Sequence, residues 1–308
     1  MGFKFETIIC STDFSKHSEK TLEQGVELSK IFGARLLIFH SIPIVHDQFY
    51  GGSAFRDAGV RDKLRFKALT RIKELASGFT VNWTPVITFG EPVEELARVV
   101  EDRDVDLVVA ASYGVSGLKR MLSGTVVERM ARIINVPLFV VENVKKPQEN
   151  TSLKQISRIL VGCDASPGSL PLLKFSNTLA ERFGAELLLL HAVQSPAAGG
   201  MDEFSYTSYG EAQKEYTNHL RDNLSEMFSS SISGTAAPGI FIEPGLPEEA
   251  LVSCAEKEQC DILIVGVKQH GPLEKFLIGS TTESVLRRSR RPVIVFPSRL
   301  PDGKQSAR

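Results

Sequence analysis

Short runs of apolar residues alternate with amphipathic stretches along the whole chain, and this alternation predicts its secondary structure. Nearly continuous runs of Val, Ile and Leu are typical of strands buried on both faces of a sheet. In the first half we expect strands at residues 7–10, 35–40, 80–89, 106–111 and 136–141. Between them, apolar residues spaced by three or four positions predict helices at residues 18–32 and 57–77, from Pro92, and at residues 125–134.

The second half of the chain repeats this order. Asp13 and Asp164 lie 151 positions apart in similar surroundings, and further along Gly124 and Gly279 lie 155 positions apart. The expected strands cover residues 159–161, 186–191, 235–243, 261–266 and 293–296, with helices at residues 169–183, beyond residue 209, from Pro247 and from Ser280. A fixed offset of about half the length indicates two homologous domains rather than a solenoid of short units.

This pattern predicts two homologous α/β domains, doubly wound and Rossmann-like, each with a mostly parallel five-stranded sheet. We expect the first domain at residues 1–143, a polar linker at 144–157, the second domain at 158–299 and a flexible tail at 300–308. Long loops are expected at residues 43–55 and 194–209. They form either a lid or partner surface, or plain connectors.

Composition narrows the function classes. The 308 residues include 36 basic and 37 acidic side chains, so no nucleic-acid-binding surface is predicted. No apolar run reaches the ~20 residues of a membrane helix, and residues 1–6 lack the apolar core of a signal peptide, so we expect a cytoplasmic protein without membrane contact. The four cysteines show no C-x-x-C spacing, so no metal site is predicted.

A glycine pattern follows the fourth expected strand of each half. In the first half, Gly114 is followed after nine residues by Gly124 and a threonine. In the second, Gly266 precedes Gln269, and after nine more residues come Gly279 and a serine. Glycine lets the backbone approach a ligand closely, and the free amides that open a helix attract phosphate. The pattern therefore indicates two phosphate-binding loops.

Other residues converge on the same edge of each expected sheet. Asp13, Ile42 and Ala111 each follow a strand, and in an open parallel sheet the ligand crevice lies beyond the carboxyl ends of the strands. The hydroxyl residues Thr125 and Ser280 have a simpler alternative role as helix caps. Two copies of the pattern in equivalent places favour nucleotide binding over capping alone.

With the segment from Ser11 to Ser15 and the surroundings of His40, the glycine pattern resembles the universal stress protein family over essentially both halves. ATP-binding members of that family carry Gly-x2-Gly-x9-Gly-(Ser/Thr). The resemblance implies that Asp13 and the backbone of Thr12 hold the base or ribose, that Ile42 packs on the adenine and that Ala111 lies near the ribose. It also implies that the phosphates are surrounded by Gly114, Gly124, Thr125 and Val126. In the second half it implies Cys163, Asp164, Val193, Gly266, Gly279, Ser280 and Thr281.

Both copies depart from the family pattern. Ala111 stands where the first copy should have glycine, and Gln269 stands at a glycine position of the second. Either the glutamine side chain fills phosphate space, or the loop shifts its glycine to Gly271. We therefore expect the first half to be the better site and the second to be weakened. Unequal losses of ATP binding in Gly124→Asp and Gly279→Asp variants would follow.

Three functions are compatible with these residues. The sequence favours a regulatory stress-response protein that binds ATP or AMP, with or without Mg²⁺. The alternatives are a nucleotide-hydrolysing or adenylyl-transfer enzyme and a scaffold that binds no nucleotide. Neither a Gly-x4-Gly-Lys-(Ser/Thr) loop nor a Ser-His-Asp constellation is evident, so we assign no catalytic residue and expect at most slow ATP hydrolysis.

The family resemblance also implies that the last strands of the two halves pair within one chain, with residues 136–141 beside residues 293–296. Homodimerisation of the whole chain is left open. Arg132 and Arg287 fall towards the ends of expected helices, where cations suit the helix dipole. A local electrostatic role is therefore expected for both.

Overall fold

The computed structural model describes residues 3–44, 58–111, 126–141, 153–193, 203–232, 236–267, 278–297 and 300. The strands of the first half are β1 (Thr7–Ser11), β2 (Arg35–Ile42), β3 (Trp83–Phe89), β4 (Leu107–Ala111) and β5 (Leu138–Val141). Those of the second half are β6 (Arg158–Gly162), β7 (Glu186–Val193), β8 (Gly239–Pro244), β9 (Ile262–Gly266) and β10 (Val293–Phe296).

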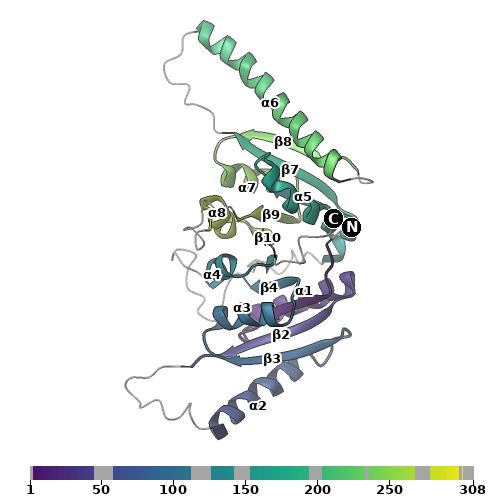
Figure 1. Cartoon of the computed structure of the whole chain (residues 1–308), viewed down its shortest axis with the longest axis vertical. Coiled ribbons are helices and arrows are strands. Elements are labelled where there is room, and N and C mark those ends of the chain that lie inside the picture. Colours follow the sequence, from purple (N-terminus) through teal and green to yellow (C-terminus); the bar gives the residue numbers. More distant parts are fainter. Residues whose placement is uncertain are drawn as a thin grey trace, which may run out of the picture.

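Helices connect these strands in the same order in both halves. The first half contains α1 (Lys16–Phe32), α2 (Ala58–Leu75), α3 (Pro92–Asp102) and α4 (Val126–Ile133). The second contains α5 (Leu170–Phe183), α6 (Glu203–Ser231), α7 (Pro247–Lys257) and α8 (Ser280–Arg288). Figure 1 shows the halves stacked along the long axis, with the first half below the second.

All described strands belong to one sheet, in the order β3-β2-β1-β4-β5-β10-β9-β6-β7-β8. Strands within each half are parallel, as in β1 with β2 and β6 with β7. The halves meet where β5 and β10 run antiparallel, with Ile294 opposite Phe139. This confirms the expected fold class and the expected pairing of the last strands.

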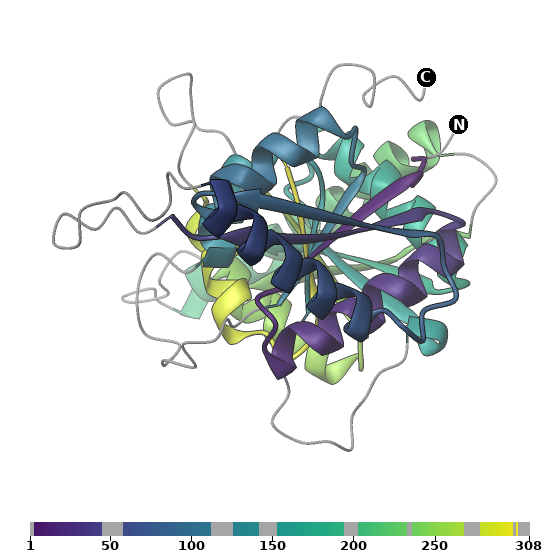
Figure 2. The same cartoon turned by 90° about the horizontal axis from the view of Figure 1, so that it is seen from below.

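Helices cover both faces of this sheet, as the view from below shows (Figure 2). Each face carries one cluster of buried apolar side chains, and each cluster draws residues from both halves. On one face the rings of Phe5 and Phe175 lie 5.9 Å apart between centroids, although they belong to different halves. The halves therefore share a continuous core.

Local sequence explains where several helices begin and end. Ser15 caps α1 by accepting a hydrogen bond from the Ser18 amide, and Gly33 ends that helix at a φ of 68°. Gly184 ends α5 in the same way, at a φ of 66°. Proline opens both α3 and α7, where its missing amide hydrogen costs no helical hydrogen bond.

One part of the secondary-structure prediction was wrong. Helix α6 begins at Glu203, so it includes Tyr206 and Tyr209, which we placed in a loop at 194–209. Within the predicted linker, Leu153 and Ile156 are buried. Residues 45–57 and the tail from 301 onward lie outside the described residues. Among the residues described, no helix combines the length and apolarity of a membrane span.

Candidate functional site

A cavity of about 560 Å³ opens at the carboxyl ends of β6, β7 and β9. Asp164, which follows β6, lines it together with Gly266 at the end of β9. Gly279 and Ser280 line it from the beginning of α8. The structure thus brings together residues that are more than a hundred positions apart, at the edge where the sequence predicted a crevice.

The start of α8 has the form of an anion-binding helix end. Gly279 is the N-cap residue, and no side-chain hydrogen bond caps the helix from that position. A side-chain carbon added at Gly279 would meet no atom of the described residues within 4 Å, so these residues leave the space beside the first turn open. The Thr282 hydroxyl donates to the carbonyl oxygen of Gly266 over 2.9 Å, which ties α8 to β9. The first amides of α8 are therefore held in a fixed place facing the cavity.

The Asp164 carboxylate is held by its own turn. Its Oδ1 accepts a hydrogen bond from the Ser166 amide over 3.2 Å and from the Ser166 hydroxyl over 2.7 Å, and the Ser169 hydroxyl also donates to it. Ala165 between them has a φ of 54°, an uncommon conformation that turns the chain tightly. These hydroxyl contacts orient the carboxylate of Asp164. Sequence reasoning missed both serines, because neither side chain makes the helix-capping hydrogen bond that is usual for serine at a helix start.

Apolar residues complete the second-half cavity. Leu172 of α5 and Leu251 of α7 both line it. A side-chain carbon at Gly162 would lie 2.9 Å from Leu251, so the glycine at the end of β6 lets α7 approach the sheet. The cavity therefore combines an apolar wall with an acceptor and a helix end. Cys163 and Thr281 line it as well, whereas Val193, also described, is not among its lining residues.

The first half has the same framework. The Asp13 carboxylate accepts from the Ser15 amide over 3.0 Å, and Ile42 is buried at the end of β2. Ala111 ends β4, and Val126 begins α4 with 53% of its surface exposed. The Thr12 hydroxyl lies 2.9 Å from the Ser18 hydroxyl. Gly114, Gly124 and Thr125, together with Gln269 in the second half, lie outside the described residues.

In each half, the turn after the first strand carries an aspartate, Asp13 or Asp164, and we call these the acidic turns. A histidine from the neighbouring strand contacts each acidic turn. His191 Nδ1 lies 2.9 Å from the carbonyl oxygen of Cys163, and His40 Nδ1 lies 2.9 Å from that of Thr12. A carbonyl oxygen only accepts, so Nδ1 carries the hydrogen in both rings. Burial lowers the pKa of His40, despite the opposing effects of the Thr12 hydrogen bond and the Asp13 charge.

The thiols near these turns are poor nucleophiles. Burial is the main cause that raises the pKa of Cys163 to about 12, and burial also raises that of Cys10. Because the thiolate is the reactive form, neither side chain is suited to covalent chemistry at neutral pH. Both cysteines are buried and therefore serve as packing residues.

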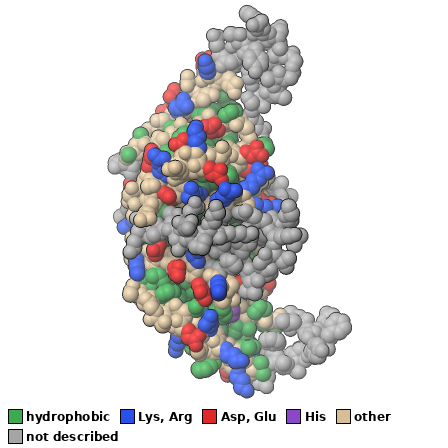
Figure 3. Space-filling view, turned by 180° about the vertical axis from the view of Figure 1, so that it is seen from behind, with side chains coloured by type: hydrophobic (Ala, Val, Ile, Leu, Met, Phe, Trp, Pro, Cys, Tyr) green, Lys and Arg blue, Asp and Glu red, His purple; other side chains and the backbone are tan. Residues whose placement is uncertain are grey.

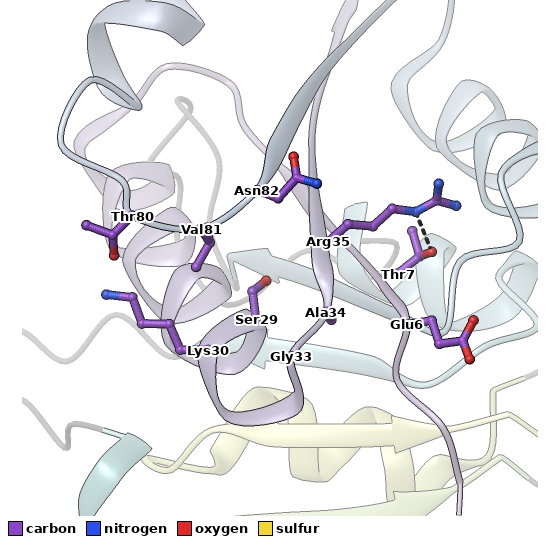
Figure 4. Close-up of a pocket in the computed structure, with 10 residues that line it drawn as sticks. All are labelled: Glu6, Thr7, Ser29, Lys30, Gly33, Ala34, Arg35, Thr80, Val81 and Asn82. Atoms are coloured by element: carbon purple, nitrogen blue, oxygen red, sulfur yellow. Dashed lines mark hydrogen bonds between the residues drawn. The ribbon is translucent and has the colours of Figure 1, made fainter.

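A second cavity, of about 700 Å³, lies in the first half (Figure 4). Arg35 and Thr7 line it, and the Arg35 Nε already donates to the Thr7 hydroxyl over 2.8 Å. Another nitrogen of the same guanidinium donates to the Arg103 carbonyl oxygen. The cavity lies at the amino ends of β1 and β2, away from the acidic turns, so we assign it no nucleotide-binding role.

The described surface shows no broad field of one charge on the face drawn in Figure 3, where basic and acidic side chains are interspersed. Some exposed charges of the described residues pair with each other, as Arg129 does with Glu91 over 2.9 Å and Arg288 with Glu249 over 3.2 Å. Such exposed pairs are worth little individually.

Comparisons with known proteins agree on the kind of protein. The model of the universal stress protein family matches residues 4–142 and 155–297. Universal stress protein YxiE of Bacillus subtilis is 28% identical over 146 residues, which is 44% of this chain and 99% of that protein. Universal stress protein Rv2005c of Mycobacterium tuberculosis is 25% identical over 224 residues, 68% of this chain and 67% of that protein.

The fold of the whole chain also has a solved counterpart. The crystal structure of a universal stress protein from Archaeoglobus fulgidus superposes with a TM-score of 0.66 at 20% identity. The match covers 98% of this chain and 99% of that one. The overall fold of the whole chain is therefore shared with a solved structure.

Proposed function

The chain belongs to the universal stress protein family. From this premise we propose that it is a regulatory protein that binds an adenine nucleotide, ATP or AMP, at the carboxyl ends of the parallel strands of each half. The observation that carries the proposal is the second-half cavity, which Asp164, Gly266 and Gly279 share. Its volume of about 560 Å³ lies within the usual range for small-molecule sites.

Each part of that cavity suits one part of a nucleotide. The amides that begin at Ser280 and Thr281 suit the phosphates, since they combine free donors with the positive end of the helix dipole. The Asp164 carboxylate suits a ribose hydroxyl or a base amino group. Leu172 and Leu251 offer apolar area for the base.

We propose the equivalent roles in the first half. Asp13 and the Thr12 backbone hold the base or ribose, Ile42 packs on the base, and Ala111 lies near the ribose. The phosphates contact Gly114, Gly124, Thr125 and Val126. The similarity of the two acidic turns, down to equal histidine-to-carbonyl distances of 2.9 Å, supports treating the halves alike.

Binding is the proposed activity rather than turnover. Both acidic turns offer acceptors fixed by their own loops, which suits recognition, and no paired acid and base is assigned to either. Mg²⁺ bound with ATP would screen phosphate charge in such a site, and slow hydrolysis is compatible with that arrangement.

Two measurements test the proposal. Mass analysis of ligand released from freshly purified, denatured protein should detect AMP or ATP. Calorimetric titration should then show ATP binding that Gly279→Asp weakens, because a carboxylate placed in open space beside α8 repels phosphate. Gly78→Asp is a matched control, since a side-chain carbon there would also meet no described atom within 4 Å. Gly78 lies between α2 and β3 and is not among the residues that line the cavity. The proposal would be contradicted if the unmodified chain bound no ATP, or if Gly279→Asp bound ATP as tightly as the unmodified chain.

A further inference from the structure

One wall of the first-half cavity contains a buried hydroxyl without a partner. Ser29 of α1 lines this cavity of about 700 Å³, and only 2% of its surface is exposed. Its Oγ has no hydrogen-bond partner among the described residues, which is uncommon for a buried polar atom. Figure 4 shows this hydroxyl pointing toward the space between Val81 and Arg35. The cavity therefore offers a polar group that the described residues leave unused.

The charge of Arg35, which also lines the cavity, is not balanced by a carboxylate of the described residues. Its Nε donates to the Thr7 hydroxyl over 2.8 Å, and its Nη2 donates to the Arg103 carbonyl oxygen over 3.2 Å. Both acceptors are neutral, and Nη1 has no acceptor among the described residues. Glu6 is the acidic residue of the lining, and its side chain extends away from the guanidinium in Figure 4.

The second half shows that the fold does not require an unbalanced charge here. At the offset of 151, Glu186 stands in place of Arg35, and the arginine is Arg158 on the neighbouring strand. Arg158 donates to the Glu258 carbonyl oxygen over 2.7 Å and pairs with Glu186 over 3.0 Å. A guanidinium therefore bonds an equivalent carbonyl in both halves, but a carboxylate neutralises it only in the second.

Two further polar groups of the cavity are also absent from the second half. Ala180 stands in place of Ser29 at the offset of 151, and Ala237 stands in place of Asn82 at the offset of 155. Ala180 is buried, so packing at this position accepts a methyl group in place of a hydroxymethyl group. The Ser29 hydroxyl and the Asn82 amide are therefore not demanded by the fold that the two halves share.

Lys30 adds a second cation to the lining. It lies in the last turn of α1, where a cation suits the helix dipole, so its charge has a structural role as well. With Arg35 it gives the lining two basic residues against one acidic residue, Glu6. At the equivalent position the second half has Glu181 in place of Lys30. The first-half cavity is thus the one that suits an anion.

We propose that this cavity binds a small organic carboxylate. Two hydrogen bonds fix the guanidinium of Arg35, and its planar donors match the geometry of a carboxylate. The Ser29 hydroxyl and the Asn82 amide supply further donors, and the volume lies in the range of small-molecule sites. The site is separate from the cavity of the second half, so it does not rest on nucleotide binding.

The test uses the full-length protein with succinate and glutamate as probes, and with succinamide as the uncharged counterpart of succinate. Saturation-transfer difference NMR should show saturable binding of at least one carboxylate at concentrations up to about 10 mM, and roughly tenfold weaker binding of succinamide. Arg35→Gln should weaken carboxylate binding roughly tenfold, and Ser29→Ala about threefold. Arg158→Gln is the matched control and should leave the affinity unchanged, because that arginine pairs with Glu186 in the second half.

Asn82→Asp covers the case in which Arg35→Gln does not fold. Asn82 is exposed, and the substitution keeps its shape while adding a negative charge to the lining, so carboxylate binding should weaken about fivefold. Thermal unfolding checks that each variant is folded. The proposal is overturned if neither carboxylate binds, or if succinamide binds as tightly as succinate.

Two further outcomes would also overturn it. One is that Asn82→Asp, or Arg35→Gln when it folds, keeps the affinity of the unmodified chain. The other is that inorganic phosphate displaces the carboxylate as well as succinate itself does, since the site would then select charge rather than a carboxylate. ATP binding measured on the same samples bears on the proposed function alone, so the failure of either proposal is distinguishable from that of the other.

Discussion

Nδ1 of His40 donates a hydrogen bond over 2.9 Å to the carbonyl oxygen of Thr12, the residue immediately before Asp13. The ring of Phe14, on the other side of Asp13, lies 4.2 Å from the imidazole between centroids. Phe14 has a φ of 63°, which a bulky residue rarely adopts. The histidine therefore holds a strained turn against the end of β2 and fixes where the carboxylate sits.

Replacing His40 should separate the contribution of its hydrogen bond from that of its packing contacts. His40→Ala loses the hydrogen bond and the ring contacts, so we expect a loss of about 2 kcal/mol in the free energy of unfolding. His40→Asn keeps a donor near the position of Nδ1 and should lose about half as much. Urea denaturation monitored by circular dichroism measures both. Equal losses in the two variants would show that the donor contributes nothing.

Stability should also depend on pH through His40. Burial lowers its pKa in the folded state below the ordinary value of 6.5, so the unfolded chain binds the proton more tightly. The stabilisation is fully present above pH 6.5 and is lost as the pH falls through the folded-state pKa. Unfolding free energies of the parent and His40→Asn, measured from pH 7.5 down to about pH 5, should therefore converge at the acid end.

The fold could be predicted because its signals are local or repeated. Buried parallel strands read as apolar runs, and the offset between Asp13 and Asp164 revealed the duplication. The start of α6 could not be predicted, since Tyr206 and Tyr209 favour neither helix nor loop strongly and the expected loop lacked a clear capping residue. Propensity is a weak guide where no apolar face sets the helical period.

Less of the site could be predicted than of the fold. Strand ends and glycine spacing correctly brought Asp164, Gly266 and Gly279 to one cavity. The expected local role of Arg287 was incomplete, because its main partner Glu128 is 159 positions away in the other half. A pair of that separation leaves no trace in spacing. This contact depends on the antiparallel pairing of β5 with β10, which joins the two halves and brings Glu128 of α4 to Arg287 of α8.

Close packing of α1 on β1 gives a further prediction. A side-chain carbon at Gly25 would lie 2.0 Å from Sγ of the fully buried Cys10. Gly25→Ala should therefore cost about 3 kcal/mol of stability, at the upper end for overpacking, despite the higher helix propensity of alanine. Cys10→Ala in the same chain removes the sulfur and should recover most of the loss. A double-mutant cycle by urea denaturation gives the interaction energy, and additive effects would contradict the contact.

The serines around Asp164 offer the sharpest test of that carboxylate as a ligand group. Ser169→Ala removes a hydroxyl that donates to Oδ1 and leaves the Ser166 bonds, so the carboxylate becomes less well oriented. With Gly124→Asp present to silence the first half, we expect ATP affinity to fall about fivefold, equivalent to about 1 kcal/mol and the usual worth of one hydrogen bond. Ser176→Ala is the control, since that hydroxyl donates to the Leu172 carbonyl oxygen within α5.

The stability of both serine variants, measured by thermal unfolding, separates orientation from folding. Ser176 is fully buried, so its loss should affect stability at least as much as that of Ser169 while leaving ATP affinity unchanged. If Ser169→Ala binds ATP as tightly as its parent, the fixed carboxylate of Asp164 does not contact the nucleotide. Recognition in the second half would then rest on the amides of α8 alone, and AMP and inorganic phosphate would compete in proportion to their charge rather than their nucleoside.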